Sequence, residues 1–153
     1  MRRERRGDQL RLLSVATSTA LLTLVSNGAA TADTWRVEAS VVPGQADGAD
    51  PSTFEQVVKR EFARLEVDDT HCPSKCVLSA TLVRLRTQPR GNLVTASCSV
   101  SATLRERSSG SIRAVLRGRA RASDGKVRAE RTRAAVMEAA VHSALSRLES
   151  PRQ

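Results

Sequence analysis

Strict alternation of apolar and polar residues predicts three half-buried β-strands. In the clearest stretch, residues 94–104, the apolar side chains share one side and Ser or Thr occupies the other. Residues 34–41 alternate in the same way, and so do residues 112–122, where arginine fills most of the polar positions. A fourth strand is predicted at 77–87. Its apolar positions change parity midway, which indicates either a β-bulge or burial of both faces.

Two other segments repeat their apolar residues at helical spacing. Asp50 and Pro51 predict the start of the first helix as N-cap and first-turn proline, and Ser52 with Glu55 offers a capping box as an alternative start. The first helix has an apolar stripe of Phe54, Val57, Val58, Phe62 and Leu65. The second helix runs from about Val127 to Leu148, with a stripe of Ala134, Met137, Val141, Ala144, Leu145 and Leu148.

The order of elements is therefore β-α-β-β-β-α. Short turns between the last three strands predict an antiparallel meander, and the first strand reaches the sheet through the first helix as a crossover. This order predicts an α+β fold, a two-layer sandwich in which two helices cover one face of a four-stranded, mostly antiparallel sheet. The order resembles that of small periplasmic accessory domains, such as the lipoprotein activators of peptidoglycan synthases and the N-terminal domain of the Tol-system translocation protein. The resemblance implies a fold and no particular function.

The N-terminus has the pattern of an export signal. Residues 1–6 are mostly basic, residues 12–25 are uncharged and rich in Leu, Val and Ala, and Ala30 and Ala32 have the spacing that signal peptidase accepts. We expect residues 1–32 to be a cleaved signal peptide and residues 33–153 to form a single small domain, periplasmic or extracellular. The alternative is an uncleaved anchor, although the apolar portion falls short of the roughly 20 residues that span a bilayer. No later transmembrane segment is predicted.

Export would place the three cysteines in an oxidising compartment, where a pair should form a disulfide. A Cys72–Cys76 bridge needs no long-range alignment, whereas a bridge from either residue to Cys98 would link neighbouring strands, and both pairings stay open. His71 could join Cys72 and Cys76 as metal ligands, but a disulfide explains the same residues more simply. We therefore predict no metal and no cofactor.

Candidate catalytic residues are few. His71 follows Asp68 and Asp69 and precedes Ser74, an arrangement that allows a small hydrolase-like site. A catalytic site would also need a positioned nucleophile and an oxyanion site, and no G-x-S-x-G, H-E-x-x-H or phosphate-loop pattern is present. His142 falls on the solvent side of the second helix. We predict that the protein is not an enzyme.

Charge is distributed unevenly along a chain whose formal net charge is +9. Residues 84–133 contain thirteen basic and three acidic residues. If the meander forms, seven arginines gather on the helix-free face beside a Ser and Thr surface: Arg84, Arg86, Arg105, Arg113, Arg117, Arg119 and Arg121. Guanidinium forks match phosphate and carboxylate groups, although an ordinary solvated sheet face would look the same in sequence.

These observations favour an exported, non-catalytic binding or accessory domain that contacts an anionic polymer, a lipid head group or an envelope protein through the arginine-rich face. The alternative is a structural or assembly module that docks on an envelope protein by strand pairing. A small hydrolase-like enzyme is the third hypothesis. Nucleic acid is not expected as a partner, because export argues against it and single-strand binding uses aromatic platforms that this chain lacks.

Overall fold

The computed structural model describes residues 35–65, 67, 71–72 and 75–149. The main elements are β1 (Trp35–Val41), α1 (Pro51–Ala63), β2 (Cys76–Arg90), β3 (Leu93–Glu106), β4 (Ile112–Gly125) and α2 (Ala129–Leu145). Two short 3-10 turns, Lys126–Arg128 and Ser146–Leu148, lie on either side of α2. The predicted order β-α-β-β-β-α and the α+β fold class are confirmed. The predicted signal peptide lies outside the described residues.

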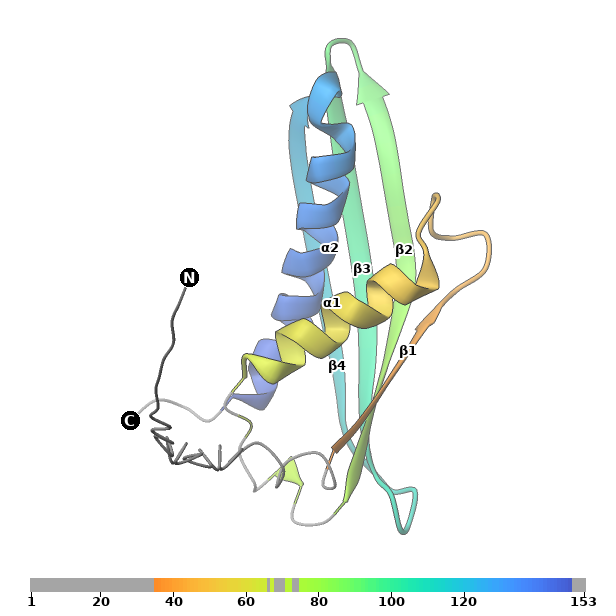
Figure 1. The fold of residues 1–153 in the computed structure, drawn as a ribbon, viewed down its shortest axis with the longest axis vertical. Coiled ribbons are helices and arrows are strands. Elements are labelled where there is room, and N and C mark those ends of the chain that lie inside the picture. Colours follow the sequence, from red (N-terminus) through yellow and green to blue (C-terminus); the bar gives the residue numbers. More distant parts are fainter. Residues whose placement is uncertain (1–34, 66, 68–70, 73–74, 150–153) are drawn as a thin grey trace, which may run out of the picture.

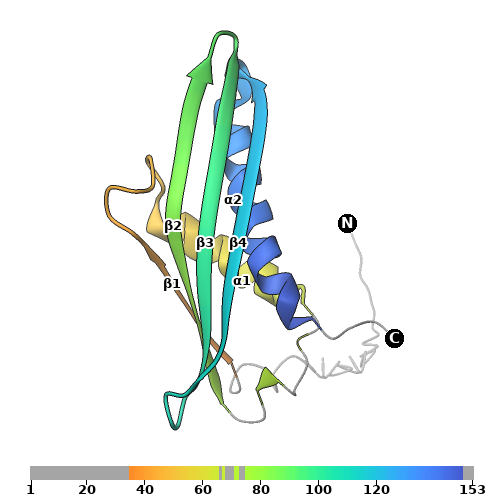
Figure 2. The same cartoon turned by 180° about the vertical axis from the view of Figure 1, so that it is seen from behind.

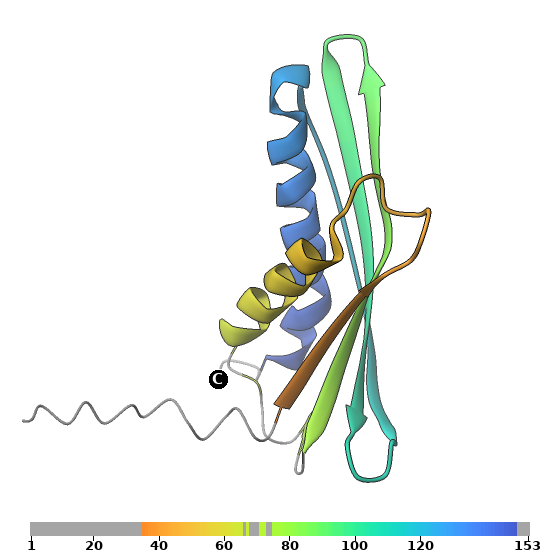
Figure 3. The same ribbon diagram turned by 45° about the vertical axis from the view of Figure 1, so that its right-hand side comes forward.

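The four strands form one open sheet in the order β1-β2-β3-β4. β1 is parallel to β2, as the predicted crossover through α1 requires, and the β2-β3 and β3-β4 pairs are antiparallel. Both helices pack against one face, so the molecule has two layers (Figures 1 and 3). Seen from behind, β2, β3 and β4 carry no helix over their other face (Figure 2).

The parity change in β2 comes from a β-bulge. The pairing of β2 with β3 shifts register between Leu82 and Arg84, so Val83 is the extra residue and its side chain is 41% exposed. Beyond the bulge, Leu85 returns to the buried face. β2 continues to Arg90, three residues past the predicted end, because Gly91 at φ 57° and Asn92 suffice for a tight hairpin.

The core lies between the sheet and the two helices. Phe54, Val57 and Val58 of α1 are buried as predicted, and the side chain of Asp50 accepts the backbone N–H groups of Ser52 and Thr53 as the N-cap. The rings of Trp35 and Phe62 are partly buried at its edge, with centroids 5.2 Å apart.

One part of the α2 stripe differs from the prediction. Ala134 is exposed, and the buried face instead includes Thr132, Val136 and Ala140. The rest of the predicted stripe, from Met137 to Leu148, is buried. Alanines lie on several sides of this helix, so an alanine such as Ala134 does not by itself indicate the buried face. Within the described residues no helix combines the length and the apolar character needed to cross a bilayer.

A second register shift affects the start of β4. It lies between Leu104 and Arg105, and it pairs Ile112 with Arg105. Ile112 is therefore 65% exposed, against the prediction that it lies on the apolar side with Ala114. Sequence alternation failed here because a bulge inserts one residue without any change in residue type.

Candidate functional site

Five arginines of β2 and β4 lie on the helix-free face of the sheet. In β4, the buried residues Leu116 and Gly118 face α2. Side chains alternate along a strand, so Arg117, Arg119 and Arg121 point the opposite way and are exposed. In β2, Leu85 is buried toward the helices, and its neighbours Arg84 and Arg86 are exposed on the other side. We name these residues together the arginine face: Arg84, Arg86, Arg117, Arg119 and Arg121.

Strand register arranges four of them in two rows across the central strand. Arg84 pairs with Ser99, which pairs with Arg119 on the other side. Arg86 pairs with Ser97, which in turn pairs with Arg121. Neighbouring strands are about 4.8 Å apart, so the arginine backbones of one row are separated by about 10 Å with a serine between them.

A third, one-sided row lies beside these two. Ser101 pairs with Arg117 on β4 and with Thr81 on β2. Successive rows are two residues apart along β3, which corresponds to about 7 Å. The side chains of Ser97, Ser99 and Ser101 are half-buried and short. An open hollow of about 310 Å³ is lined by Ser97, Ser99, Arg119 and Arg121, together with Cys98 and Ala120.

The arginine face carries positive charge that few nearby acids offset. Among the described residues, no ion pair or side-chain hydrogen bond involves any of the five arginines. The acids at the border are engaged elsewhere: Glu38 binds Arg36 at 3.2 Å and Arg105 at 3.3 Å, and Asp47 accepts the backbone N–H of Thr87 at 3.4 Å. Nearby like charges make an anionic ligand favourable here.

The other two candidate arginines lie apart from the arginine face. Arg105 is on the helix-free side, but Glu38 offsets its charge. Arg113 follows Ile112 at the register shift, and its Nη2 lies 2.8 Å from Glu106 Oε2. The prediction that Arg113 continues the row of β4 arginines is therefore wrong, because the bulge breaks the alternation before β4 pairs regularly.

The cysteines occupy the region where β2 begins. Cys72 Sγ and Cys76 Sγ are 2.10 Å apart, at disulfide bonding distance, and both residues are buried. Of the two pairings that the sequence left open, the structure has the local Cys72–Cys76 bridge and not a bridge to Cys98. Cys98 is a buried thiol on the core side of β3, and burial raises its pKa to about 12.

The two histidines differ in their surroundings. His71 lines a hollow of about 200 Å³ with Leu104, Arg113 and Ala114, and its Nδ1 is buried with no hydrogen-bond partner among the described residues. Asp68, Asp69 and Ser74, the other members of the hydrolase hypothesis, lie outside the described residues.

His142 is exposed on α2, on the predicted solvent side, yet it takes part in a helix–helix contact. Its Nδ1 lies 3.5 Å from Oε2 of Glu61, a carboxylate of α1 that is buried. Glu61 also accepts from Arg64 Nη1 at 2.8 Å. Glu61 could not be singled out from the sequence, because a single acid on a helix is typical of a solvated residue.

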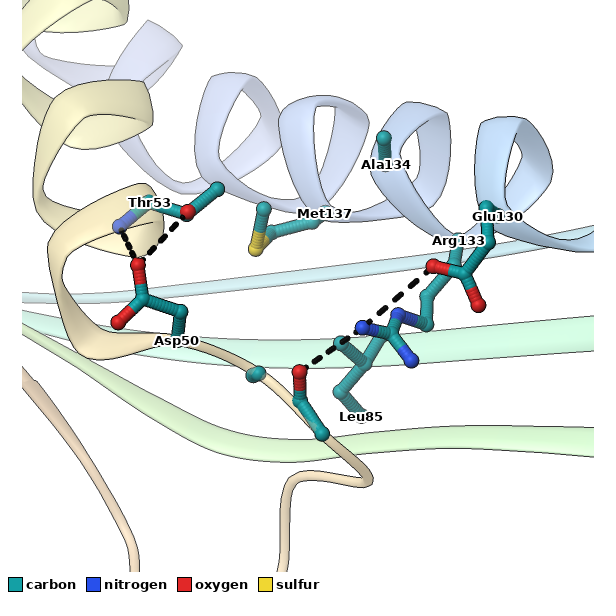
Figure 4. A pocket seen from close by; sticks show the side chains of 9 residues that line it. Asp50, Thr53, Leu85, Glu130, Arg133, Ala134 and Met137 are labelled. Atoms are coloured by element: carbon teal, nitrogen blue, oxygen red, sulfur yellow. Dashed lines mark hydrogen bonds and ion pairs between the residues drawn. The ribbon is translucent and has the colours of Figure 1, made fainter.

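A hollow of about 210 Å³ lies between α2, the start of α1 and the loop before it (Figure 4). Arg133 extends from α2 across this space, and its Nη2 donates to the carbonyl oxygen of Gly48 at 2.9 Å. Glu130 and Asp50 border the same hollow. The local sequence does not reveal this contact, which joins residues 85 positions apart.

Metal-binding geometry is absent from the part of the chain that the structure describes, where no three His, Cys, Asp or Glu residues gather in a suitable group. On the arginine face the groups available to a ligand are guanidinium donors and serine hydroxyls. This combination can bind phosphate, sulfate or carboxylate oxygens through charge-assisted hydrogen bonds.

No protein-family model matches the sequence, and no curated protein is significantly similar to it. Several solved structures resemble the fold. The PelC dodecamer from Paraburkholderia phytofirmans is 12% identical, with a TM-score of 0.50, over 74% of this chain and 89% of that chain. A minor lipoprotein from Acinetobacter baumannii is 13% identical, with a TM-score of 0.49, over 79% of this chain and 98% of its own. At such identities the similarity concerns the fold alone.

Proposed function

We propose that this protein is an exported, non-catalytic binding module that contacts an anionic component of the cell envelope through the arginine face. The observation that carries the proposal is the pair of Arg–Ser–Arg rows on a sheet face without a helix. Five guanidinium groups that form no ion pair within the described part of the chain make this surface suited to an anionic partner.

Export is supported by the signal-like pattern of residues 1–32. The mature chain would then begin at Asp33. Intact mass measurement of the protein purified from its native source tests this step: a mass corresponding to residues 33–153 supports export, and a mass that retains Met1 contradicts cleavage.

The side chains of the arginine face support binding rather than catalysis. A nucleophilic serine needs a general base within hydrogen-bond reach. Ser97 and Ser99 are flanked across the sheet by arginines, and no histidine or carboxylate belongs to either row. Arginine keeps its proton in proteins, so it cannot act as that base.

The test is retention of the mature protein on an anionic matrix at moderate salt. Replacing Arg117, Arg119 and Arg121 together with Ser should abolish retention. A charge-matched control replaces three exposed arginines near or on α2 with Ser: Arg128, Arg131 and Arg147. The control should bind nearly as well as the wild type. Equal loss in both variants would show that only net charge matters, and unchanged retention of the first variant would contradict the proposal.

A second candidate function is docking on an envelope protein by strand pairing. β4 is the last strand of the sheet, and its outward residues Ile112 and Val115 are 65% and 55% exposed. An open strand edge can pair with an extended segment of a partner. Salt separates the two functions, since high salt releases an electrostatic complex and leaves an edge-paired complex intact.

A further inference from the structure

We propose that the ligand of the arginine face is a linear polyanion that lies extended along β3, with successive charged groups bound by successive arginine rows. This inference rests on the proposed function and specifies its ligand class. The ligand chemistry is a chain of carboxylate or phosphodiester groups, and the repeat of the rows along the strand is the feature that selects a polymer.

From the strand register, the rows are expected to enclose a shallow groove along β3. Long arginine side chains rise from β2 and β4, while short serine side chains cover β3 between them. The hollow lined by Ser97, Ser99, Arg119 and Arg121 forms the β3–β4 side of this groove. A ligand group in the groove meets guanidinium donors from two sides and a serine hydroxyl from below.

The groove has defined ends along β3. At one end, Thr95 and Ser123 are hydrogen-bonded to each other at 2.8 Å, so their hydroxyls are engaged. At the other end, Thr103 lies between Ser79 and the exposed Val115, where the arginines stop. The charged segment therefore extends over the three rows at Ser97, Ser99 and Ser101.

Charge repetition favours a polymer over a single small anion. One phosphate or carboxylate can occupy one row, which leaves the arginines of the next row, about 7 Å away, without a counter-charge. An extended chain that carries an anionic group at each row places a counter-charge between the arginines of both complete rows and reaches Arg117. Linked groups also bind with an effective concentration that free anions lack.

The composition of the groove argues against a membrane surface. A peripheral protein that lies on lipid usually inserts apolar or aromatic side chains between its basic residues. Here the positions between the arginines are serines. The exposed Ile112 and Val115 lie outside the rows, and so does Val83, the bulge residue that precedes Arg84. A flat bilayer would also contact only the arginine tips and leave the serine floor unused.

The first experiment measures binding of the mature protein to fluorescent oligogalacturonates and to glycerol phosphate oligomers, each as monomer, dimer, tetramer and octamer. Affinity should rise roughly a hundredfold from monomer to tetramer and change little beyond it, because the groove spans three rows. The two oligomer series distinguish carboxylate from phosphodiester as the preferred group. Vesicles of phosphatidylcholine with phosphatidylglycerol provide the membrane comparison.

A second experiment fills the groove without changing its charge. Ser99→Val places a bulkier, apolar side chain between Arg84 and Arg119 and removes the serine hydroxyl. Valine suits a β-strand, so the fold should be kept while tetramer binding weakens at least tenfold. Thr103→Val is the control, since it lies on the same strand and face but outside the rows. Circular dichroism confirms that both variants fold.

The outcomes separate this inference from the proposed function. Binding that grows with oligomer length and is lost in Ser99→Val supports a polymer in the groove. Arginine-dependent binding to vesicles, with monomers and tetramers bound equally, would overturn the polymer and keep the anion-binding function. No binding to any anionic probe, by a protein that is folded, would overturn both.

Discussion

Gly118 of β4 lies directly against Ala140 of α2: a Cβ added at Gly118 would lie 1.9 Å from the carbonyl oxygen of Ala140. The same Cβ would lie 2.7 Å from the backbone nitrogen of Ala144. Both contacts are to backbone atoms, which cannot rotate away as a side chain can. The absence of a side chain at position 118 therefore allows the helix to lie directly on the sheet.

Gly118→Ala should destabilise the protein by about 3 kcal/mol or more, because α2 must move away from β4 and lose packing against it. Urea denaturation followed by circular dichroism measures the loss. Gly125→Ala is the matched control: it has φ of −61° and no atom within 4 Å of the added Cβ, so its stability should be unchanged or slightly higher. Equal midpoints for the two variants would contradict the close packing.

Much of the fold follows from local sequence. The alternation in β3 predicted its buried apolar residues, although Thr95 of the polar side is buried as well. The parity change in β2 left a bulge and burial of both faces open, and the structure has the bulge, at Val83. The bulge at the start of β4 carries no such signal, because Ile112 and Arg113 look like a continuation of the strand. In α2, the predicted stripe from Met137 to Leu148 is buried, and Ala134 is the member that lies on the exposed side, because alanines occur on several sides of this helix.

The candidate site was predictable in part. Alternation indicates that the β4 arginines share one side, but the sequence does not give the register that places Arg84 opposite Arg119 across Ser99. Register depends on hairpin geometry and on bulges, and a shift of one residue reverses every side chain. The rows are therefore a property of the folded sheet.

Glu61 stabilises the contact between α1 and α2. Its side chain is 7% exposed and lies near Arg64 and His142. Glu61→Gln keeps the shape but removes the charge, so it should lower the free energy of unfolding by about 1–2 kcal/mol. The value is modest because Arg60, Arg64 and His142, which neighbour the carboxylate, are all substantially exposed. Glu138→Gln is the control. Glu138 pairs with Arg60 where both side chains are nearly half exposed, and its replacement should change stability by less than about 0.5 kcal/mol.

Both variants are compared by urea midpoint at neutral pH. A Glu61→Gln protein as stable as the Glu138→Gln protein would show that the buried carboxylate contributes nothing to helix packing.

Burial raises the pKa of the Cys98 thiol to about 12, and this shift predicts a pH dependence of stability. In the unfolded chain the thiol ionises near pH 9, and in the folded protein it stays neutral. The unfolded state is therefore favoured progressively as the pH rises from about 9 toward 12, and the contribution of Cys98 to stability is intact below pH 9.

In the folded protein at pH 8, the thiol should react with iodoacetamide far more slowly than in the denatured chain.

Urea midpoints at pH 8 and pH 10 test the alkaline loss. Cys98→Ala removes the titrating group, so its midpoint should fall less over this interval than that of the wild type. Parallel decreases in the two proteins would assign the alkaline loss to other groups.

The Cys72–Cys76 bridge should make a small contribution to stability. It closes a short loop, with a sequence separation of 4, so the entropy it removes from the unfolded chain is limited to about 2 kcal/mol. The test uses Cys72→Ala with Cys76→Ala, both in a Cys98→Ala background that prevents thiol exchange. The variant should retain the wild-type far-ultraviolet spectrum and unfold at lower urea. Dithiothreitol should lower the midpoint of the parent protein to that of the variant and leave the variant unchanged. A parent protein insensitive to dithiothreitol, with both thiols free by mass spectrometry, would contradict the bridge, because a disulfide that does not form cannot restrict the unfolded chain.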